Sequence, residues 1–374
     1  MANSIFDYNS TFRDAAKKVK FRLDVASKEH YDIFAQPWYK KHFKFGAAPH
    51  ITKDFKTILG KLYTPVAAST INDRSAEPLR MNQGFTEMAQ TMFTHAHAYR
   101  MSADELRNLL LMAQMAEKQG DIAAVEYIAD VLMNHVKAAV EGVDARLDLI
   151  ILSALSNGGQ YTFSKENDPG SPYAGETISF GMPSANKAVV GTGNEWVSGN
   201  EDKVDPIKEI EDVLAKQRTA IKTILIDRQT LRFLQKTKAM RSYVNSTLYP
   251  NQPLSISAVN RWMGDNAYPT FEIVEREVAV QDGTKINTVT PYKTGQLVFL
   301  PETQIGTIET CLSDAEIGLK SDGVKYSNYG RVEVRRLTQG EKENATYCEI
   351  TKASLTAAPS MDTIDRIMTL DTTK

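Results

Sequence analysis

Cysteine is scarce in this sequence: Cys311 and Cys348 are the only two among 374 residues. Two cysteines are too few for a disulfide framework, and they lack the Cys-x-x-Cys spacing of zinc and redox motifs. This cysteine usage fits a reducing compartment, in which both would be buried thiols or bystanders.

Long apolar runs are also missing. No stretch approaches the roughly 18 uninterrupted apolar residues that span a bilayer. The start, Met1-Ala-Asn-Ser-Ile-Phe-Asp, lacks the basic and apolar regions of a secretory signal. The sequence therefore predicts a cytoplasmic protein with no membrane stage.

Neither sign of charge is in large excess, since 44 Lys and Arg face 46 Asp and Glu. The chain as a whole therefore has no electrostatic attraction for nucleic acid. Residues 1–60 depart from this balance, with eleven basic side chains against six acidic ones. We interpret them as a mildly basic arm with a solvated face, in preference to a DNA contact.

Aromatic side chains are frequent in the first part of the sequence. Residues 1–60 are rich in them but only weakly periodic, so this segment cannot close a core alone and is expected to lie over another surface. Residues 63–100 then predict an extended two-stranded excursion with a polar tip near residues 72–78. A ribbon of that length is marginal in water, so it too is expected to lie on something else.

Helical signals follow. Ser102 and Glu105 form a capping box that predicts a helix start. Apolar residues at three- and four-residue steps then predict one amphipathic helix over residues 121–157, about 55 Å long and ended by Asn157-Gly158-Gly159. Methionines at helical spacing are expected in the core, namely Met112, Met115 and Met133.

The second half alternates short helices and strands. Residues 158–204 are rich in Gly, Ser, Asn and Pro and predict a loop or hairpin at a domain boundary. Asp205-Pro206 predicts the N-cap and first position of a helix. The predicted order after it is a strand at 222–227, a helix through Leu231, Leu234 and Met240, a helix at 257–263, strands at 271–278, 285–289 and 295–301, strands at 332–337 and 347–353, and a helix near 362–368.

Enzyme signatures are weak. Ser184-Ala-Asn-Lys187 with Lys293-Thr294-Gly295 matches two sequence motifs of the serine acyl-transfer enzymes. In those enzymes the nucleophilic serine stands at the start of a helix, whereas the residues after Ser184 have the pattern of a β-strand. His95-x-His97 offers two metal ligands on one strand face without a third by spacing, so structural histidines are the preferred interpretation. Gly191-Thr-Gly193 lacks the rest of a dinucleotide-binding turn.

Three blocks carry a resemblance to a known family: residues 141–158 at the end of the long helix, residues 205–244, and residues 254–309 with Trp262-Met-Gly264 and Gln296-Leu-Val-Phe-Leu-Pro301. In this order they resemble the lambda-like major capsid protein E family of tailed bacteriophages. The resemblance implies an α+β chain with the Hong Kong 97-type capsid fold. It also implies no catalytic site, cofactor or metal.

The resemblance further implies five segments: an N-terminal arm at 1–60, an extended loop at 61–100, a peripheral domain at 101–204 with a spine helix at about 121–157, an axial domain at 205–301, and a return to the peripheral domain at 302–374. Under this hypothesis, inter-subunit contacts are expected at Phe6, Phe12, Trp38 and Tyr39 in the arm and at Arg74, Glu77 and Arg80 in the loop. Ordinary surface or local packing is the alternative for each residue.

The implied partners are other copies of the chain, as pentamers and hexamers of an icosahedral shell. A separate scaffolding protein is expected because no long helix-rich N-terminal extension is seen; a portal, a decoration protein and non-specifically bound packaged DNA complete the set. The shell would be assembled in the bacterial host cytoplasm and end in the virion. Two alternatives stay open: a cellular nanocompartment (encapsulin-like) shell of the same fold, and a serine acyl-transfer enzyme using Ser184 and Lys187.

Overall fold

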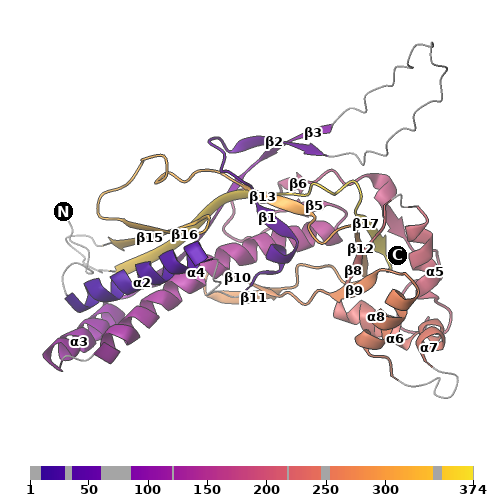
Figure 1. Cartoon of the computed structure of the whole chain (residues 1–374), viewed down its shortest axis with the longest axis horizontal. Helices are drawn as coiled ribbons and strands as arrows, with labels where there is room; N and C mark the ends of the chain where they lie inside the picture. The colour runs from indigo at the N-terminus through magenta and orange to yellow at the C-terminus, as the bar shows by residue number, and fades with distance from the viewer. Residues whose placement is uncertain are drawn as a thin grey trace, which may run out of the picture.

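The computed structural model describes residues 10–29, 36–59, 86–119, 122–216, 219–245, 253–339 and 348–373. Helix α4, Ile122–Ser156, runs along a first body and reaches a second one at its C-terminal end (Figure 1). Each body has its own hydrophobic core. No helix in the described segments is long and apolar enough to cross a membrane.

The first body is a sheet covered by helices. Its strands follow the order β1-β13-β16-β15-β14, and β4 also pairs with β16; they are β1 (Phe43–Phe45), β13 (Gly306–Thr310), β16 (Cys348–Ser360), β15 (Val332–Gln339), β14 (Lys325–Tyr329) and β4 (Phe93–Met101). Helix α3, Ala103–Gln119, follows the predicted capping box, in which the Ser102 backbone N–H donates to Glu105 at 2.7 Å. The predicted helices before residue 158 are confirmed as α3 and α4.

Helix α2, Ser10–Glu29, lies along α4 (Figure 1) and also contacts β14. Buried residues recur at four-residue steps on one stripe of α2, at Ala15, Val19 and Leu23. Residues 10–29 of the predicted arm thus lie on their own chain. Their helix was missed because one narrow apolar stripe among lysines gives only a weak periodic signal.

A two-stranded ribbon projects from the first body. Strands β2 (Asp54–Leu59) and β3 (Thr86–Thr91) pair antiparallel, from Asp54 opposite Thr91 to Leu59 opposite Thr86. Figure 1 shows the ribbon extending away from β13 and β16. A two-stranded excursion was expected over residues 63–100; the described strands begin earlier, and its predicted tip lies outside the described residues.

The second body is built on the sheet β7-β17-β12-β8-β9. Its strands are β7 (Lys187–Val189), β17 (Met368–Asp371), β12 (Gln296–Leu300), β8 (Thr223–Ile226) and β9 (Thr270–Ile273), and its helices are α5 (Pro206–Leu214), α6 (Arg228–Lys236), α7 (Lys238–Val244) and α8 (Ile256–Asp265). The predicted start of α5 is confirmed, since the Asp205 carboxylate accepts from the Ile207 backbone N–H at 3.1 Å.

Several predicted elements differ in the structure. The single helix through Leu231 and Met240 is broken at Thr237, whose extended backbone and side chain cap α7. The strand predicted at 271–278 is two strands, because β9 joins the second sheet and β10 (Val278–Asp282) forms a hairpin with β11 (Lys285–Val289). The helix predicted near 362–368 is wrong: that segment is a series of turns before β17.

The second sheet also takes strands from segments that the resemblance placed in the peripheral domain. All five residues of β12 are buried, so this strand needs a neighbour on each edge. One edge pairs with β8 and the other with β17, which in turn pairs with β7. The short elements between the bodies are the hairpin of β5 (Gln160–Thr162) and β6 (Thr177–Ser179) and the one-turn helix η2 (Ser184–Asn186).

Candidate functional site: assembly surfaces and a histidine cavity

The arm residues Trp38 and Tyr39 lie on α4 of their own chain, in the one-turn helix η1 (Trp38–Lys41). Their backbone N–H groups donate to the Asp148 carboxylate at 3.1 and 2.8 Å, and the Tyr39 hydroxyl donates to Asp144 at 2.7 Å. Tyr39 is buried, whereas Trp38 is half-buried. The backbone and the Tyr39 ring therefore anchor the arm internally, and of these two side chains Trp38 offers the larger outward surface.

Asp148 is the centre of this anchor, with no exposed surface. Burial raises its pKa, while hydrogen bonds from Tyr39 and Trp38 and the charge of Arg276 act in the opposite direction. The Arg276 Nε lies 2.8 Å from the carboxylate. A single buried carboxylate thus joins the arm, α4 and the segment that leads to β10.

The other predicted contact residues are placed differently. Phe6, Arg74, Glu77 and Arg80 lie outside the described residues, and Phe12 lies in α2 with its side chain outside them. Their interface roles stay predictions. None of these residues is brought into a common site with Trp38 in the part of the chain that the structure describes.

The ribbon of β2 and β3 is held to the body at its base. Phe55 and Met92 are buried there and form a small apolar cluster with Ala358 of β16. Thr91 donates a hydrogen bond to the Asp54 carboxylate at 2.7 Å across the ribbon. Two strands with no third neighbour are marginally stable in water. The ribbon is therefore a surface that a neighbouring molecule would stabilise.

Helix α3 presents a second candidate surface. Leu111, Met112 and Met115 are 59%, 38% and 55% exposed, while Leu106 and Leu109 fill the face toward the core. The expectation that Met112 and Met115 lie in the core is wrong. The signal was in the sequence: the run 109–112 is apolar at four consecutive positions, which wraps around a helix, so part of it has to face outward.

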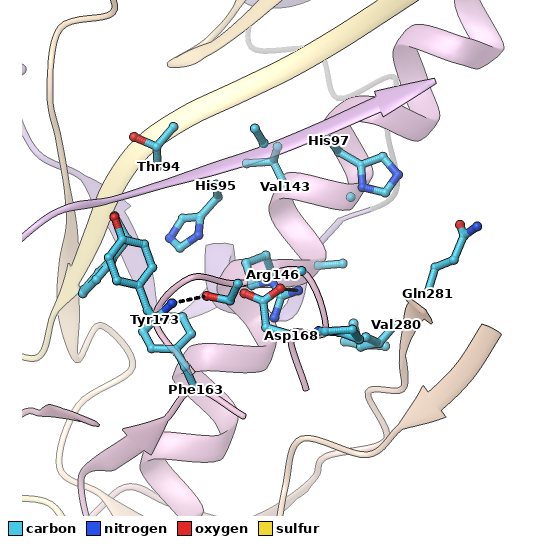
Figure 2. A pocket seen from close by; sticks show the side chains of 18 of the residues that line it. Thr94, His95, His97, Val143, Arg146, Phe163, Asp168, Tyr173, Val280 and Gln281 are labelled. Atoms are coloured by element: carbon cyan, nitrogen blue, oxygen red, sulfur yellow. Dashed lines mark hydrogen bonds and ion pairs between the residues drawn. The ribbon is translucent and has the colours of Figure 1, made fainter. Parts of the chain in front are cut away.

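A cavity of about 400 Å³ lies between β4, α4, the loop at 163–173 and β10. Its walls are aromatic and aliphatic at Phe93, Phe163, Tyr173 and Val280, and polar at His95, His97, Arg146 and Asp168. Figure 2 shows Arg146 and Asp168 beside each other, with His95 projecting from β4 above them. The two histidines of the sequence motif therefore line one cavity, together with residues from three other segments.

The polar groups of the cavity are organised around Arg146. Its guanidinium donates to the Asn167 carbonyl at 2.7 Å and to the Asp168 carboxylate at 3.1 Å. Burial, and next the charge of Arg146, lower the pKa of His95 to about 3. The same two causes lower the pKa of His97. Both rings are thus held neutral beside a cation.

The described residues form neither a metal site nor a serine acyl-transfer site. Among the described residues, no three His, Cys, Asp or Glu side chains are placed to hold a metal ion. Ser184 is exposed at the start of η2, and the described part of the chain holds no hydrogen bond between its hydroxyl and Lys187. Gly295 is a turn residue at φ +79° that leads into β12, where its N–H donates to Asp227 at 3.1 Å.

The neutral state of His95 predicts a pH dependence of stability. Its folded-state pKa of about 3 lies below the unfolded value of about 6.5, so its contribution is complete above about pH 6.5 and is lost progressively as the pH falls from there toward 3. At pH 5 the free energy of unfolding should be lower by about 2 kcal/mol than at pH 8 from this group alone. Urea denaturation of unassembled chain at both pH values measures the change.

The His95→Leu variant should lack this part of the pH dependence. His50→Gln is the matched control, because His50 is a half-exposed partner of Glu309 at 3.0 Å and leaves His95 untouched. Equal pH dependence in the wild type and His95→Leu would contradict the assignment.

A family model described as phage major capsid protein E matches residues 45–315. No curated protein matches the chain significantly.

Three solved structures are similar over most of their length. A protein assigned as a prophage capsid protein of Escherichia coli is 11% identical, with 94% of this chain and 98% of that chain covered at a TM-score of 0.55. A phage-related protein of Bordetella bronchiseptica is 10% identical, with 94% and 96% covered at 0.46. The capsid of Myoviridae phage XM1 is 10% identical, with 91% and 94% covered at 0.44. The first of these matches shows a shared fold.

Proposed function

The chain belongs to the phage major capsid protein E family, and on that premise we propose that its copies gather as pentamers and hexamers in an icosahedral shell around double-stranded DNA. It is a shell-forming capsid protein with the Hong Kong 97-type fold and a component of the virion. The family match favours the phage shell over the cellular nanocompartment. Capsid proteins of this family are structural proteins, which leaves the serine acyl-transfer alternative without support.

The observation that carries the proposal is the projecting ribbon of β2 and β3. In the described chain its buried contacts lie at its base, where Phe55 packs with Ala358 and the His50 ring, and β2 and β3 pair only with each other. An unsupported pair of strands gains stability when its surface is buried on another subunit. The predicted loop residues that follow β2 then lie across a neighbouring copy.

The second body is the proposed axial domain. It consists of the sheet around β12 with α5 to α8, and joins the first body through β12 and the end of α4, where Ser156 accepts a hydrogen bond from the Lys293 backbone N–H at 3.0 Å. A compact unit at one end of a long helix is suited to meet its copies around a symmetry centre. The first body, which lies along the rest of α4, and its ribbon then contact further neighbours. Because each subunit is held by many weak contacts of this kind at once, multivalency makes a closed shell resistant to disassembly.

The finer partners belong to the same proposal. A separate scaffolding protein sets the shell diameter, a portal occupies one vertex, and a decoration protein is a further partner on the outside. Assembly takes place in the host cytoplasm, before DNA enters. The exposed side chains Leu111 and Met115 of α3 form one apolar surface that a neighbouring copy covers.

Electron microscopy after co-expression with the neighbouring phage genes tests the proposal. The wild type should give shells of uniform diameter. The double variant Arg74→Glu with Arg80→Glu should fold but stay as small oligomers, because reversed charges in the loop repel the surface that it crosses. Lys165→Glu with Lys320→Glu reverses two charges in exposed loops of the first body and should still assemble. A persistent monomer of the wild type would contradict the shell, and normal shells from the loop variant would contradict the loop contact.

A further inference from the structure

The histidine cavity between β4, α4, the loop at 163–173 and β10 contains a buried polar atom without a partner. His95 is only 8% exposed, and its Nε2 makes no hydrogen bond within the described chain. Figure 2 shows the ring projecting from β4 toward the pair of Arg146 and Asp168. Buried polar groups are normally satisfied by protein, water or a ligand. A ligand that bonds to Nε2 therefore supplies an interaction that the fold itself leaves unmade.

The cavity is large enough for a molecule of one or two rings. Its volume is about 400 Å³. A water molecule takes up about 30 Å³, an apolar cavity of about 150 Å³ holds benzene, and small-molecule pockets begin near about 300 Å³. A single water bonded to His95 would therefore leave most of the cavity without close contacts, whereas a ring system would fill it.

One wall of the cavity is aromatic. The centroid of the Phe93 ring lies 5.2 Å from that of Phe163 and 5.0 Å from that of Tyr173. Aromatic rings prefer tilted or offset partners at about 4.5–7 Å, the arrangement that these rings already show. Tyr173 is 40% exposed, so part of its ring remains open to contact. The buried side chains of Val143 and Val280 line the same cavity, so a planar aromatic occupant finds apolar contacts there as well.

The charges that line the cavity are already paired. Arg146 and Asp168 are the only lining residues of opposite charge, and their side chains lie 3.1 Å apart. Burial, and next the charge of Arg146, lower the pKa of His95 to about 3, so that its ring stays uncharged at neutral pH. A charged ligand would lose its hydration here without finding an unpaired opposite charge. The cavity therefore favours a neutral occupant.

We propose that the cavity binds a neutral planar aromatic molecule carrying one N–H or O–H group, with its ring against Phe93 and Tyr173 and its polar group on the Nε2 of His95. A neutral imidazole accepts a hydrogen bond at one ring nitrogen and donates at the other, so Nε2 is able to accept from such a group. The bound molecule touches β4, α4 and β10 together and thus stabilises the first body. The inference goes beyond the proposed function and does not depend on shell formation.

Isothermal titration of unassembled full-length chain with indole tests the site. Indole should bind, and 1-methylindole, which has the same rings without the N–H, should bind about tenfold more weakly because the hydrogen bond to His95 is lost. Indole at about ten times its dissociation constant should raise the midpoint of thermal unfolding by about 2 °C. The comparison of the two probes needs no variant, so it holds even if a substitution impairs folding.

Substitutions of His95 place the probe in the cavity. His95→Leu removes the ring nitrogen, so the affinity for indole should fall about tenfold and its advantage over 1-methylindole should disappear. A side chain that served packing alone would leave the ratio of the two affinities unchanged. His95→Gln offers an amide acceptor and should keep part of the preference. His50→Gln is the matched control and should bind as the wild type does, because His50 lies outside the cavity, 3.0 Å from Glu309.

Four results would overturn the inference: no binding of indole by folded wild-type chain, equal affinities of the wild type for indole and 1-methylindole, an unchanged preference in His95→Leu, or an equal loss in His50→Gln. Tighter binding of indole-3-acetate than of indole would also overturn it, because the cavity would then select an organic anion. Shells that form normally alongside any of these failures leave the proposed function standing.

Discussion

Asp148→Ala is expected to lower the free energy of unfolding by about 4 kcal/mol. The substitution removes the acceptor of the Trp38 and Tyr39 backbone N–H groups, each of which costs about 1–3 kcal/mol when left unsatisfied in a buried site. It also removes the partner of Arg276 at 2.8 Å. The arm should detach from α4 before the rest of the body unfolds, and urea denaturation with hydrogen exchange of residues 36–45 measures both effects.

Asp130→Ala is the matched control, because Asp130 lies on the same helix and its pair with Arg22 is exposed. Its cost should stay below about 1 kcal/mol. Asp148→Asn keeps one acceptor oxygen and should fall between the two. Similar losses for Asp130→Ala and Asp148→Ala would show that the buried carboxylate does not anchor the arm.

Elements with a strong local signal could be predicted from the sequence. The capping box at Ser102 and the Asp205-Pro206 start identify α3 and α5, and the sustained spacing of apolar residues identifies α4. The apolar run 297–300 of β12 likewise predicts a buried strand. In each of these cases the information lies within a few turns or one strand, so no distant contact is needed to specify the element.

Elements that depend on distant partners could not be predicted. The segment near 362–368 has helical spacing, but Ile364 and Ile367 are buried in the first core and the Thr363 hydroxyl donates to the Ile305 carbonyl at 3.1 Å. Those tertiary contacts outweigh the local helical preference. The break at Thr237 has a local cause instead: its buried hydroxyl donates to the Leu234 carbonyl at 2.8 Å and accepts from the Met240 backbone N–H at 3.4 Å, which ends α6 and caps α7.

For the candidate sites, too, one part can be predicted from local sequence and the other depends on residues that are distant in the chain. The pair His95 and His97 is visible in the sequence, but the cavity that they line also needs Arg146, Asp168 and Val280 from three other segments. The basic excess of residues 1–60 is visible in the sequence. The cleft that Arg13 and Lys17 line also needs Lys325 and Arg336, which lie about 300 positions later. Surfaces formed by packing leave no compact motif, because their members are set by the sheet register and not by spacing.

Gly306→Ala is expected to destabilise the first body by about 3 kcal/mol or more. A Cβ at this position would overlap the carbonyl oxygen of Ser360 and lie 2.7 Å from the Phe43 ring, and the backbone of β16 cannot yield as a flexible side chain would. Gly306 lies opposite Phe43 in the parallel pairing of β1 and β13, so the change should release β1 and the arm behind it.

Gly264→Ala makes the identical change where nothing lies within 4 Å of the new Cβ, inside helix α8. It should stabilise the chain by about 1 kcal/mol, because alanine is the better helix former. Thermal and urea unfolding of both variants measure whether each substitution lowers or raises the free energy of unfolding. Opposite signs would show that close approach between β1, β13 and the end of β16 holds the arm on the body, and a harmless Gly306→Ala would place that attachment elsewhere.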